Sequence, residues 1–223
     1  MVPRPRILAV VSQKGGTGKT TTAINLAVAA MLDGKQVVVA DLAAEANATG
    51  WHGYRGEKVP LVQPTHAKGL DGLVKVAATQ RVDWLIVDTE GGVNPAAAKA
   101  VEIADYVLIT CRPGIFDRDA TVTTIRLCLA QGKIPHVLIT NIESGARVSM
   151  AEDIRAAFAG LGVEVLPGGI GRRAAFVDSL NDGRAVLEYQ PKGKAADEVR
   201  ELYALISQHD TMVSRYQDTL VAR

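Results

Sequence analysis

The chain has 223 residues, of which 22% are charged, and its formal net charge is +1. This length is enough for one α/β domain with a large core. The near balance of charge excludes a protein that coats nucleic acid through a general basic excess, so nucleic-acid contacts require a local patch. The sequence shows no apolar stretch typical of a signal peptide, and no run approaches the roughly 18 apolar residues of a membrane-spanning helix. We therefore expect a cytoplasmic protein.

Five short apolar runs along the chain predict β-strands. They cover residues 7–11, 37–40, 84–87, 106–109 and 137–139. Because these runs lack polar alternation, each strand is expected to be buried on both faces, as in a parallel sheet covered by helices on two sides.

Helical patterns separate these runs. They comprise residues 20–32, ending at Gly34; a helix to 104 that Asn94 caps and Pro95 opens; a helix that Asp117 or Asp119 opens and that ends near Gly132; and C-terminal helices at about 192–222 with Val199, Leu202, Tyr203 and Ile206 on one face. The stretch 42–58 is predicted to be irregular. The alternation predicts a single domain over residues 1–223, with a doubly wound, mostly parallel sheet and ligands at the carboxyl ends of the strands.

A glycine-rich turn between strand 7–11 and the helix after it predicts a phosphate-binding loop. Its residues are Lys14, Gly15, Gly16, Thr17, Gly18, Lys19, Thr20 and Thr21. Glycines let backbone N–H groups converge on phosphates, and the helix N-terminus adds positive potential. Lys19 is predicted to reach the β- and γ-phosphates of ATP, and the Thr20 hydroxyl to hold Mg²⁺.

The loop differs from the pattern GxxxxGK[ST] at its first position, which is Gln13, and carries a second lysine, Lys14. This resembles the deviant Walker A loop of the ParA/MinD family of dimeric ATPases, which move plasmids, chromosomes and other cargo. The resemblance implies an ATP-bound homodimer in which Lys14 reaches the partner's phosphates, as an arginine finger does. It places Lys14, Lys19 and Asp41 among the catalytic residues.

The resemblance extends over most of the chain. It implies that Asp88, at the end of strand 84–87, holds magnesium, that Asn141 hydrogen-bonds adenine, and that Pro167, after 163–166, lies where the backbone wraps the base. Segment 172–188 resembles that of small plasmid-partition ATPases, which lack an N-terminal helix-turn-helix, as this sequence does.

One carboxylate of the family pattern is absent. After the second strand the family usually reads Asp-x-Asp-Pro-Gln, whereas this chain has Asp41 followed by Ala43 in place of the second aspartate. Since that aspartate helps to position the attacking water, its loss puts hydrolysis in doubt and leaves ATP binding intact. Three interpretations stay open: a naturally slow enzyme, a substitute carboxylate such as Asp41, Glu45 or Glu90, or a deliberate Asp-to-Ala replacement.

Family members couple dimerisation to a surface, either nonspecific DNA or a membrane. Candidate DNA contacts are Arg172, Arg173, Arg184, Lys192, Lys194 and Arg200. In the C-terminal segment 211–223, the apolar face comprises Met212, Val213, Tyr216 and Leu220. The polar face has mixed charge, which favours packing on protein over membrane binding.

These observations predict a nucleoid-associated partition ATPase that works with a centromere-binding, ParB-like adaptor protein. The alternative is a positioning or DNA-transfer scaffold of the same family with little turnover. A metabolic synthetase would need a substrate pocket that the sequence does not reveal. An iron–sulfur reductase would need a suitable cysteine pair, and Cys111 ends a predicted strand whereas Cys128 falls inside a predicted helix.

Overall fold

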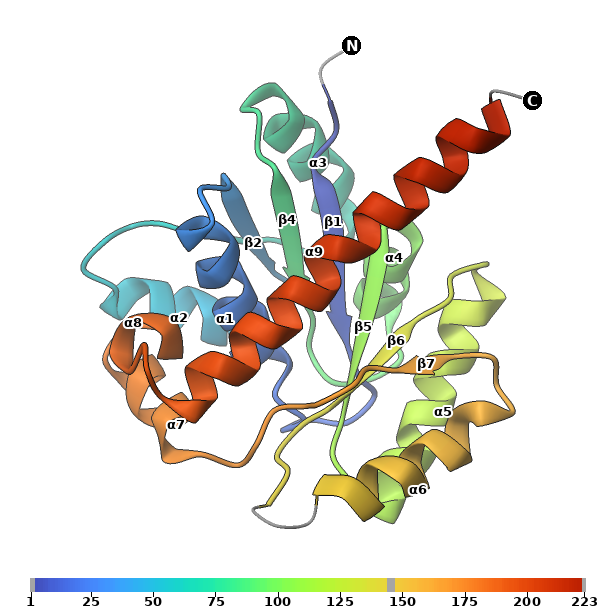
Figure 1. Ribbon diagram of the computed structural model, residues 1–223. Helices are drawn as coiled ribbons and strands as arrows, with labels where there is room; N and C mark the ends of the chain where they lie inside the picture. The colour runs from blue at the N-terminus through green and yellow to red at the C-terminus, as the bar shows by residue number, and fades with distance from the viewer. Residues whose placement is uncertain (1–2, 144–146, 222–223) are drawn as a thin grey trace.

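The computed structural model describes the backbone of residues 3–143 and 147–221, and within these the side chains of all but 147–151, 159 and 209–221. Its centre is a seven-stranded sheet in the order β3-β2-β4-β1-β5-β6-β7, in which every neighbouring pair is parallel (Figure 1). The strands are β1 (Arg6–Val11), β2 (Val37–Asp41), β3 (Leu61–Pro64), β4 (Trp84–Asp88), β5 (Tyr106–Cys111), β6 (His136–Ile139) and β7 (Glu164–Val165). The predicted doubly wound α/β fold is confirmed.

Helices connect the strands. They are α1 (Lys19–Leu32), α2 (Asn47–Tyr54), η1 (Ala67–Gly69), α3 (Leu70–Thr79), α4 (Pro95–Ile103), α5 (Ile115–Ala130), α6 (Arg147–Ala159), α7 (Ala174–Asn181), α8 (Val186–Tyr189) and α9 (Lys194–Val221). The Asn94 cap is confirmed, because its side chain accepts a hydrogen bond from the backbone N–H of Ala97 at 2.8 Å.

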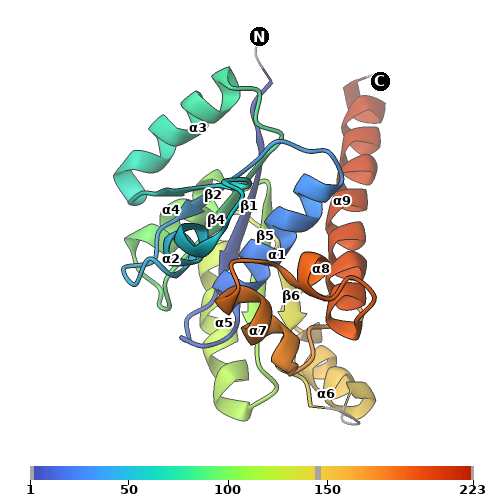
Figure 2. The same ribbon diagram turned by 90° about the vertical axis from the view of Figure 1, so that its left-hand side faces the viewer.

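Two hydrophobic layers cover the sheet. On one face, alternate strand residues such as Leu8 and Ile86 pack with α1, α8 and α9. On the other face, the intervening residues, such as Ile7 and Leu85, pack with α3, α4, α5 and α6. Figure 2 shows α1 and α9 on one side of the strands and α3 and α4 on the other. Burial on both faces explains why the strands read as continuous apolar runs.

Two local predictions were wrong. The stretch 42–58 is not irregular, because α2 forms within it; Asp41 accepts hydrogen bonds from the backbone N–H and the hydroxyl of Thr49 at 2.8 and 2.7 Å, and buried Trp51 anchors the helix. Neither Asp117 nor Asp119 opens α5, which begins at Ile115 after Gly114. The Asp117 side chain is instead used in ion pairs near the phosphate loop.

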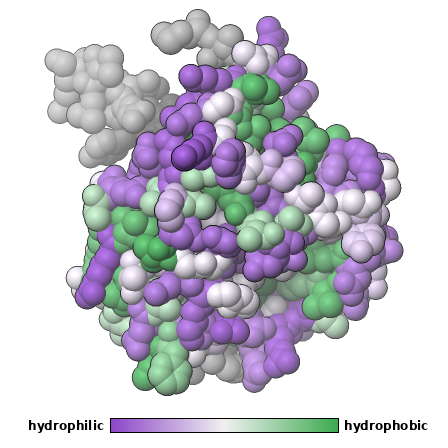
Figure 3. Space-filling model, turned by 180° about the vertical axis from the view of Figure 1, so that it is seen from behind, coloured by the Kyte–Doolittle hydropathy of each residue, from purple (hydrophilic) through white to green (hydrophobic). Residues whose placement is uncertain are grey.

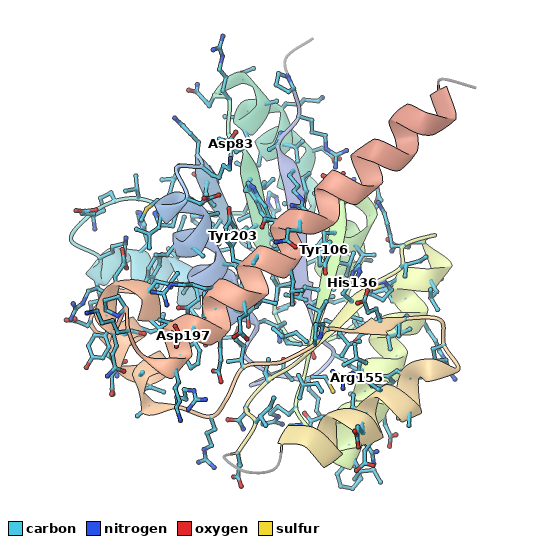
Figure 4. The ribbon with its side chains drawn as sticks, viewed as in Figure 1. Asp83, Tyr106, His136, Arg155, Asp197 and Tyr203 are labelled. Atoms are coloured by element: carbon cyan, nitrogen blue, oxygen red, sulfur yellow. The ribbon has the colours of Figure 1, made fainter. Side chains whose placement is uncertain are left out.

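The long helix α9 confirms the predicted C-terminal helix and crosses one face of the sheet (Figure 1). Val199, Leu202 and Ile206 are buried against that face. Tyr203 donates a hydrogen bond to Asp33 at 2.8 Å, and its ring lies 5.9 Å from that of Trp84. Figure 4 shows Tyr203 on α9, with Tyr106 and His136 on the neighbouring strands. The predicted apolar face of Met212, Val213, Tyr216 and Leu220 lies outside the described side chains.

The opposite surface, seen in Figure 3, alternates hydrophilic and hydrophobic residues over the helices of the second layer. Within the part of the chain that the structure describes, no helix has the length and apolar character needed to cross a bilayer. The two cysteines, Cys111 and Cys128, are free and buried. Burial raises the pKa of each thiol, so both behave as small apolar core residues.

Candidate nucleotide-binding site

The predicted phosphate loop lies between the carboxyl end of β1 and the N-terminus of α1. Gly16 and Gly18 have φ of 71° and 86°, a left-handed conformation that glycine adopts without strain. Two threonines hold the loop on the sheet: the Thr17 and Thr110 hydroxyls lie 2.8 Å apart, and the Thr140 hydroxyl donates to the carbonyl of Thr17 at 2.8 Å. The loop is therefore fixed to the ends of β5 and β6.

Lys19 opens α1 and is only 6% exposed. Its ammonium donates a hydrogen bond to the carbonyl of Lys14 at 3.0 Å, so it lies beneath the loop. Burial lowers the pKa of Lys19, and the charges of Asp88 and Glu45 oppose that shift. A buried cation at a helix N-terminus is a strong anion site, and this geometry fits a bound phosphate chain.

Asp88 ends β4 next to Lys19 and is fully buried. Among the described residues, neither of its carboxylate oxygens has a hydrogen-bond partner of good geometry. Burial raises the pKa of Asp88 to about 7, Asp41 adds to the shift, and the Thr20 hydroxyl and Lys19 oppose it. An unpaired buried carboxylate is costly unless a ligand compensates for it. Mg²⁺ typically takes one or two protein ligands together with water and phosphate oxygens, so Thr20 and Asp88 fit a magnesium site.

The second lysine of the loop, Lys14, contacts α5 and does not line the phosphate cavity. Its ammonium lies 3.6 Å from the Asp117 carboxylate of α5 and 5.7 Å from the centre of the Phe116 ring. Arg112 donates a hydrogen bond to the same carboxylate at 3.0 Å. Asp117 is largely buried, whereas the Lys14 side chain is 36% exposed. The two lysines of the loop therefore occupy different places, and Lys14 lines neither cavity described below.

A cavity of about 440 Å³ opens over the phosphate loop. It is lined by Gly15, Gly16, Gly18, Lys19, Thr20, Thr21, Ala43, Glu45, Asn47, Thr89, Glu90 and Gly91. Ala43 thus faces the phosphate end, where the family usually has a carboxylate. Asp41, predicted to be catalytic, does not line the cavity: its oxygens accept hydrogen bonds from Ala43 and Thr49 and organise the start of α2.

A second cavity of about 450 Å³ adjoins the first, and Gly16, Gly18 and Thr21 line both. Asn141, two residues after β6, lines it with φ of 56°, and Ile170 and Phe176 give it apolar walls. An amide beside apolar walls fits a nucleotide base. Pro167 is exposed and does not line this cavity; the loop that follows it, 170–173, does.

The six predicted DNA-contacting residues are largely neutralised by neighbouring acids. Four of them form ion pairs, namely Arg172 with Glu143, Arg173 with Glu198, Arg184 with Asp182 and Arg200 with Asp197. Lys192 and Lys194 are exposed and form no ion pair with a described residue. Arg172 and Arg173 also line the base cavity. The positive charge available to a polyanion is therefore smaller than the sequence indicates.

Sequence reasoning missed the contact between Gly91 and the phosphate loop. A Cβ atom at Gly91 would lie 2.9 Å from the backbone nitrogen of Gly15 and 3.2 Å from the carbonyl carbon of Lys14. The adjacent glycines Gly91 and Gly92, just after Asp88, are the signal in the sequence, because close backbone approach is a common reason for glycine.

The strand, phosphate loop and helix, with a buried lysine and an unpaired carboxylate beside it, define a P-loop nucleotide-binding protein. Residues 8–186 match the family of CobQ/CobB/MinD/ParA nucleotide-binding domains, and the chain belongs to this family.

Individual proteins of known name are also similar to this chain. Maintenance of carboxysome distribution protein A of Gloeobacter kilaueensis is 34% identical over 143 residues, which cover 62% of this chain and 64% of that protein. The chromosome-partitioning ATPase Soj of Thermus thermophilus is 26% identical over 88% of this chain and 93% of its own length. The solved MinD cell division protein of Aquifex aeolicus shares the fold with a TM-score of 0.75, at 20% identity, covering 91% of this chain and 97% of that chain.

Proposed function

We propose that this chain is a partition-type ATPase that binds ATP with Mg²⁺ and then pairs with a second copy of itself. The observation that carries the proposal is the separation of the two loop lysines. Lys19 lines its own phosphate cavity, whereas Lys14 lines neither cavity and its side chain is 36% exposed. A cation that its own site does not use is available to the phosphates of a partner copy.

The surface around Lys14 supports pairing with a second copy. Phe116 is 73% exposed, Ile115 is 58% exposed, and both begin α5 next to Lys14. Exposed apolar residues beside a functional charge are typical of an interaction surface. ATP bound between two copies would add further contacts across that surface.

Within one subunit, the residues have separate roles in this proposal. The loop N–H groups and Lys19 bind the phosphates, Thr20 and Asp88 hold Mg²⁺, and Asn141 reads the base. Bound Mg²⁺ would neutralise charge that develops on the phosphates. Ala43 leaves the phosphate cavity without the usual acid, so ATP acts chiefly as a dimerisation ligand and turnover is slow.

For the cargo, we propose DNA, moved over the nucleoid in the cytoplasm with a ParB-like, centromere-binding adaptor. The names of relatives support this, among them Protein ParA of Rhizobium radiobacter, 28% identical over 76% of this chain. The exposed Lys192 and Lys194 at the start of α9 are the strongest candidates for phosphate contacts, because the arginines are paired.

A second candidate is ATP-dependent positioning of a protein assembly. Two relatives, from Gloeobacter kilaueensis and Halothiobacillus neapolitanus, are named for maintenance of carboxysome distribution, at 34% and 26% identity. Such a protein would use the same ATP switch with a different adaptor.

Sedimentation with ATP, with ADP and without nucleotide tests the switch, alongside a DNA mobility shift under the same conditions. We expect dimers and DNA binding with ATP but not with ADP or without nucleotide. Lys14→Ala is expected to lose both. DNA binding that is equal in all three states would exclude the switch. ATP-specific dimers that leave DNA unbound would favour the second candidate.

A further inference from the structure

Glu198 of α9 is a buried carboxylate that supports the base cavity from behind. It is 6% exposed and does not line the cavity. One oxygen accepts hydrogen bonds from the backbone N–H of Gly171 at 3.0 Å and from Arg173 Nε at 3.1 Å, and the other accepts from Arg173 Nη2 at 2.7 Å. The Arg173 guanidinium thus binds the Glu198 carboxylate through two charge-assisted hydrogen bonds, an arrangement with a well-defined geometry.

The Gly171 contact continues to the residue that faces the base. Gly171 forms a parallel bridge with Ile142, whose N–H donates to the carbonyl of Ile170 at 3.1 Å and whose carbonyl accepts from Arg172 N–H at 2.8 Å. Asn141 directly precedes Ile142 and is in the left-handed conformation. Glu198 therefore fixes the loop backbone, and the loop fixes the segment that presents the Asn141 amide.

The phosphate end also has supports that do not involve Glu198 or loop 170–173. Its loop is held by Thr110 on β5 and by Thr140 just after β6, and the Thr140 N–H is itself bonded to the Cys111 carbonyl at 2.9 Å. Lys19 begins α1 and Asp88 ends β4. Loss of the Glu198 contacts is thus expected to disturb the base cavity and leave the phosphate cavity in place.

We propose that Glu198 and Arg173 are positioning residues for the base: they hold loop 170–173 so that the site favours a complete nucleotide over its phosphates alone. This rests on the proposed nucleotide-binding function. It also gives α9 a part in nucleotide recognition, since the buried carboxylate that orders the loop belongs to that helix.

The test compares the affinities for ADP and for pyrophosphate, both with Mg²⁺, by isothermal titration calorimetry. Glu198→Gln keeps the side-chain shape and an acceptor for Gly171 but loses the charge that holds Arg173. We expect its ADP affinity to fall about tenfold and its pyrophosphate affinity to stay within about twofold of the wild type. Asp197→Asn is the matched control, because Asp197 is exposed at the N-terminal end of the same helix (Figure 4) and pairs only with Arg200 among the described residues.

Arg173→Lys is the second variant, since it keeps the Glu198–Gly171 bond and replaces the fork with a point charge. We expect its ADP affinity to fall by less than that of Glu198→Gln and its pyrophosphate affinity to stay unchanged. If a thermal melt shows that Glu198→Gln does not fold, this variant decides the outcome. Unchanged ADP affinity, or equal losses for ADP and pyrophosphate, would overturn the positioning role. A wild-type chain that binds neither ADP nor ATP would instead overturn the proposed function.

Discussion

The Lys14 ammonium lies 3.6 Å from the Asp117 carboxylate of its own subunit, and Arg112 contacts the same carboxylate. In the proposed dimer Lys14 reaches the partner's phosphates, so it must leave Asp117 first. The contact therefore competes with dimerisation. A partly exposed pair of this kind contributes up to about 1 kcal/mol, which sets the scale of the effect.

Asp117→Asn is accordingly expected to lower the dissociation constant of the ATP-bound dimer by about two- to fivefold. Sedimentation equilibrium with ATP measures it. Asp71→Asn is the control, because Asp71 is also an acid in the first turn of a helix and pairs with Lys99 at 3.0 Å, far from the loop in the chain. A weaker dimer in Asp117→Asn would mean that Asp117 orients Lys14 for pairing and does not restrain it.

Introducing an acid at position 43 is expected to raise ATP turnover. Ala43 lines the phosphate cavity and its N–H is held by Asp41 at 3.1 Å, so the backbone there is fixed. A positioned carboxylate typically contributes about 10²-fold or more, and Ala43→Asp should approach that gain. Steady-state phosphate release with DNA and adaptor protein present gives the rate.

The control is Ala44→Asp, which adds the same charge one residue along, at an exposed position that does not line the cavity. Equal rates in both variants and the wild type would show that a different group activates the water. Both Glu45 and Glu90 line the cavity, but Glu90 already accepts a hydrogen bond from Asn94 at 2.8 Å, so Glu45→Gln is the first variant to test.

Asp88 makes stability and metal binding depend on pH. Burial raises its pKa from 3.8 to about 7, so the folded state holds this proton more tightly than the unfolded state. Its contribution to the free energy of unfolding is therefore greatest below pH 4 and falls as the pH rises through 7. Asp88→Asn removes this loss, and at pH 8 it should stabilise the nucleotide-free protein by on the order of a few kcal/mol.

Thermal and urea unfolding of both proteins would measure the difference at about pH 5.5 and about pH 8, one value on each side of the titration of Asp88. The gain should shrink at the lower pH, where wild-type Asp88 is protonated. In the same variant the Mg²⁺ dependence of nucleotide binding should disappear. A stability gain of equal size at both pH values would show that packing, and not ionisation of Asp88, is responsible.

Much of this architecture follows from local sequence. Continuous apolar runs specify buried parallel strands, and glycines before Lys19 specify the phosphate loop, because both depend on neighbouring residues. The α2 helix was missed because it depends on a side-chain contact that no helical pattern shows: the Asp41 carboxylate accepts hydrogen bonds from Thr49, eight residues later. The roles of Asp117, Glu198 and Gly91 were hidden because each acts on residues that the fold brings from elsewhere in the chain.

Gly91 offers a test of how tightly the loop is supported. A Cβ there would lie 2.9 Å from Gly15 N and 3.2 Å from the Lys14 carbonyl carbon, both backbone atoms that cannot rotate away. Gly91→Ala should therefore push the phosphate loop out of position and weaken binding of both ADP and pyrophosphate by about tenfold or more. Calorimetric titration of both ligands distinguishes this general loss from the base-specific loss expected for Glu198→Gln.

The matched control is Gly72→Ala in α3, where a Cβ meets nothing within 4 Å. Alanine is the better helix former by about 1 kcal/mol, so this variant should gain stability and keep its ligand affinities. If Gly91→Ala binds both ligands as the wild type does, the segment after Asp88 shifts to make room for the Cβ and does not hold the phosphate loop in place. Lys14 would then owe its position to Asp117 and Phe116 alone among the contacts described for its side chain, which makes the Asp117→Asn measurement the decisive one for that lysine.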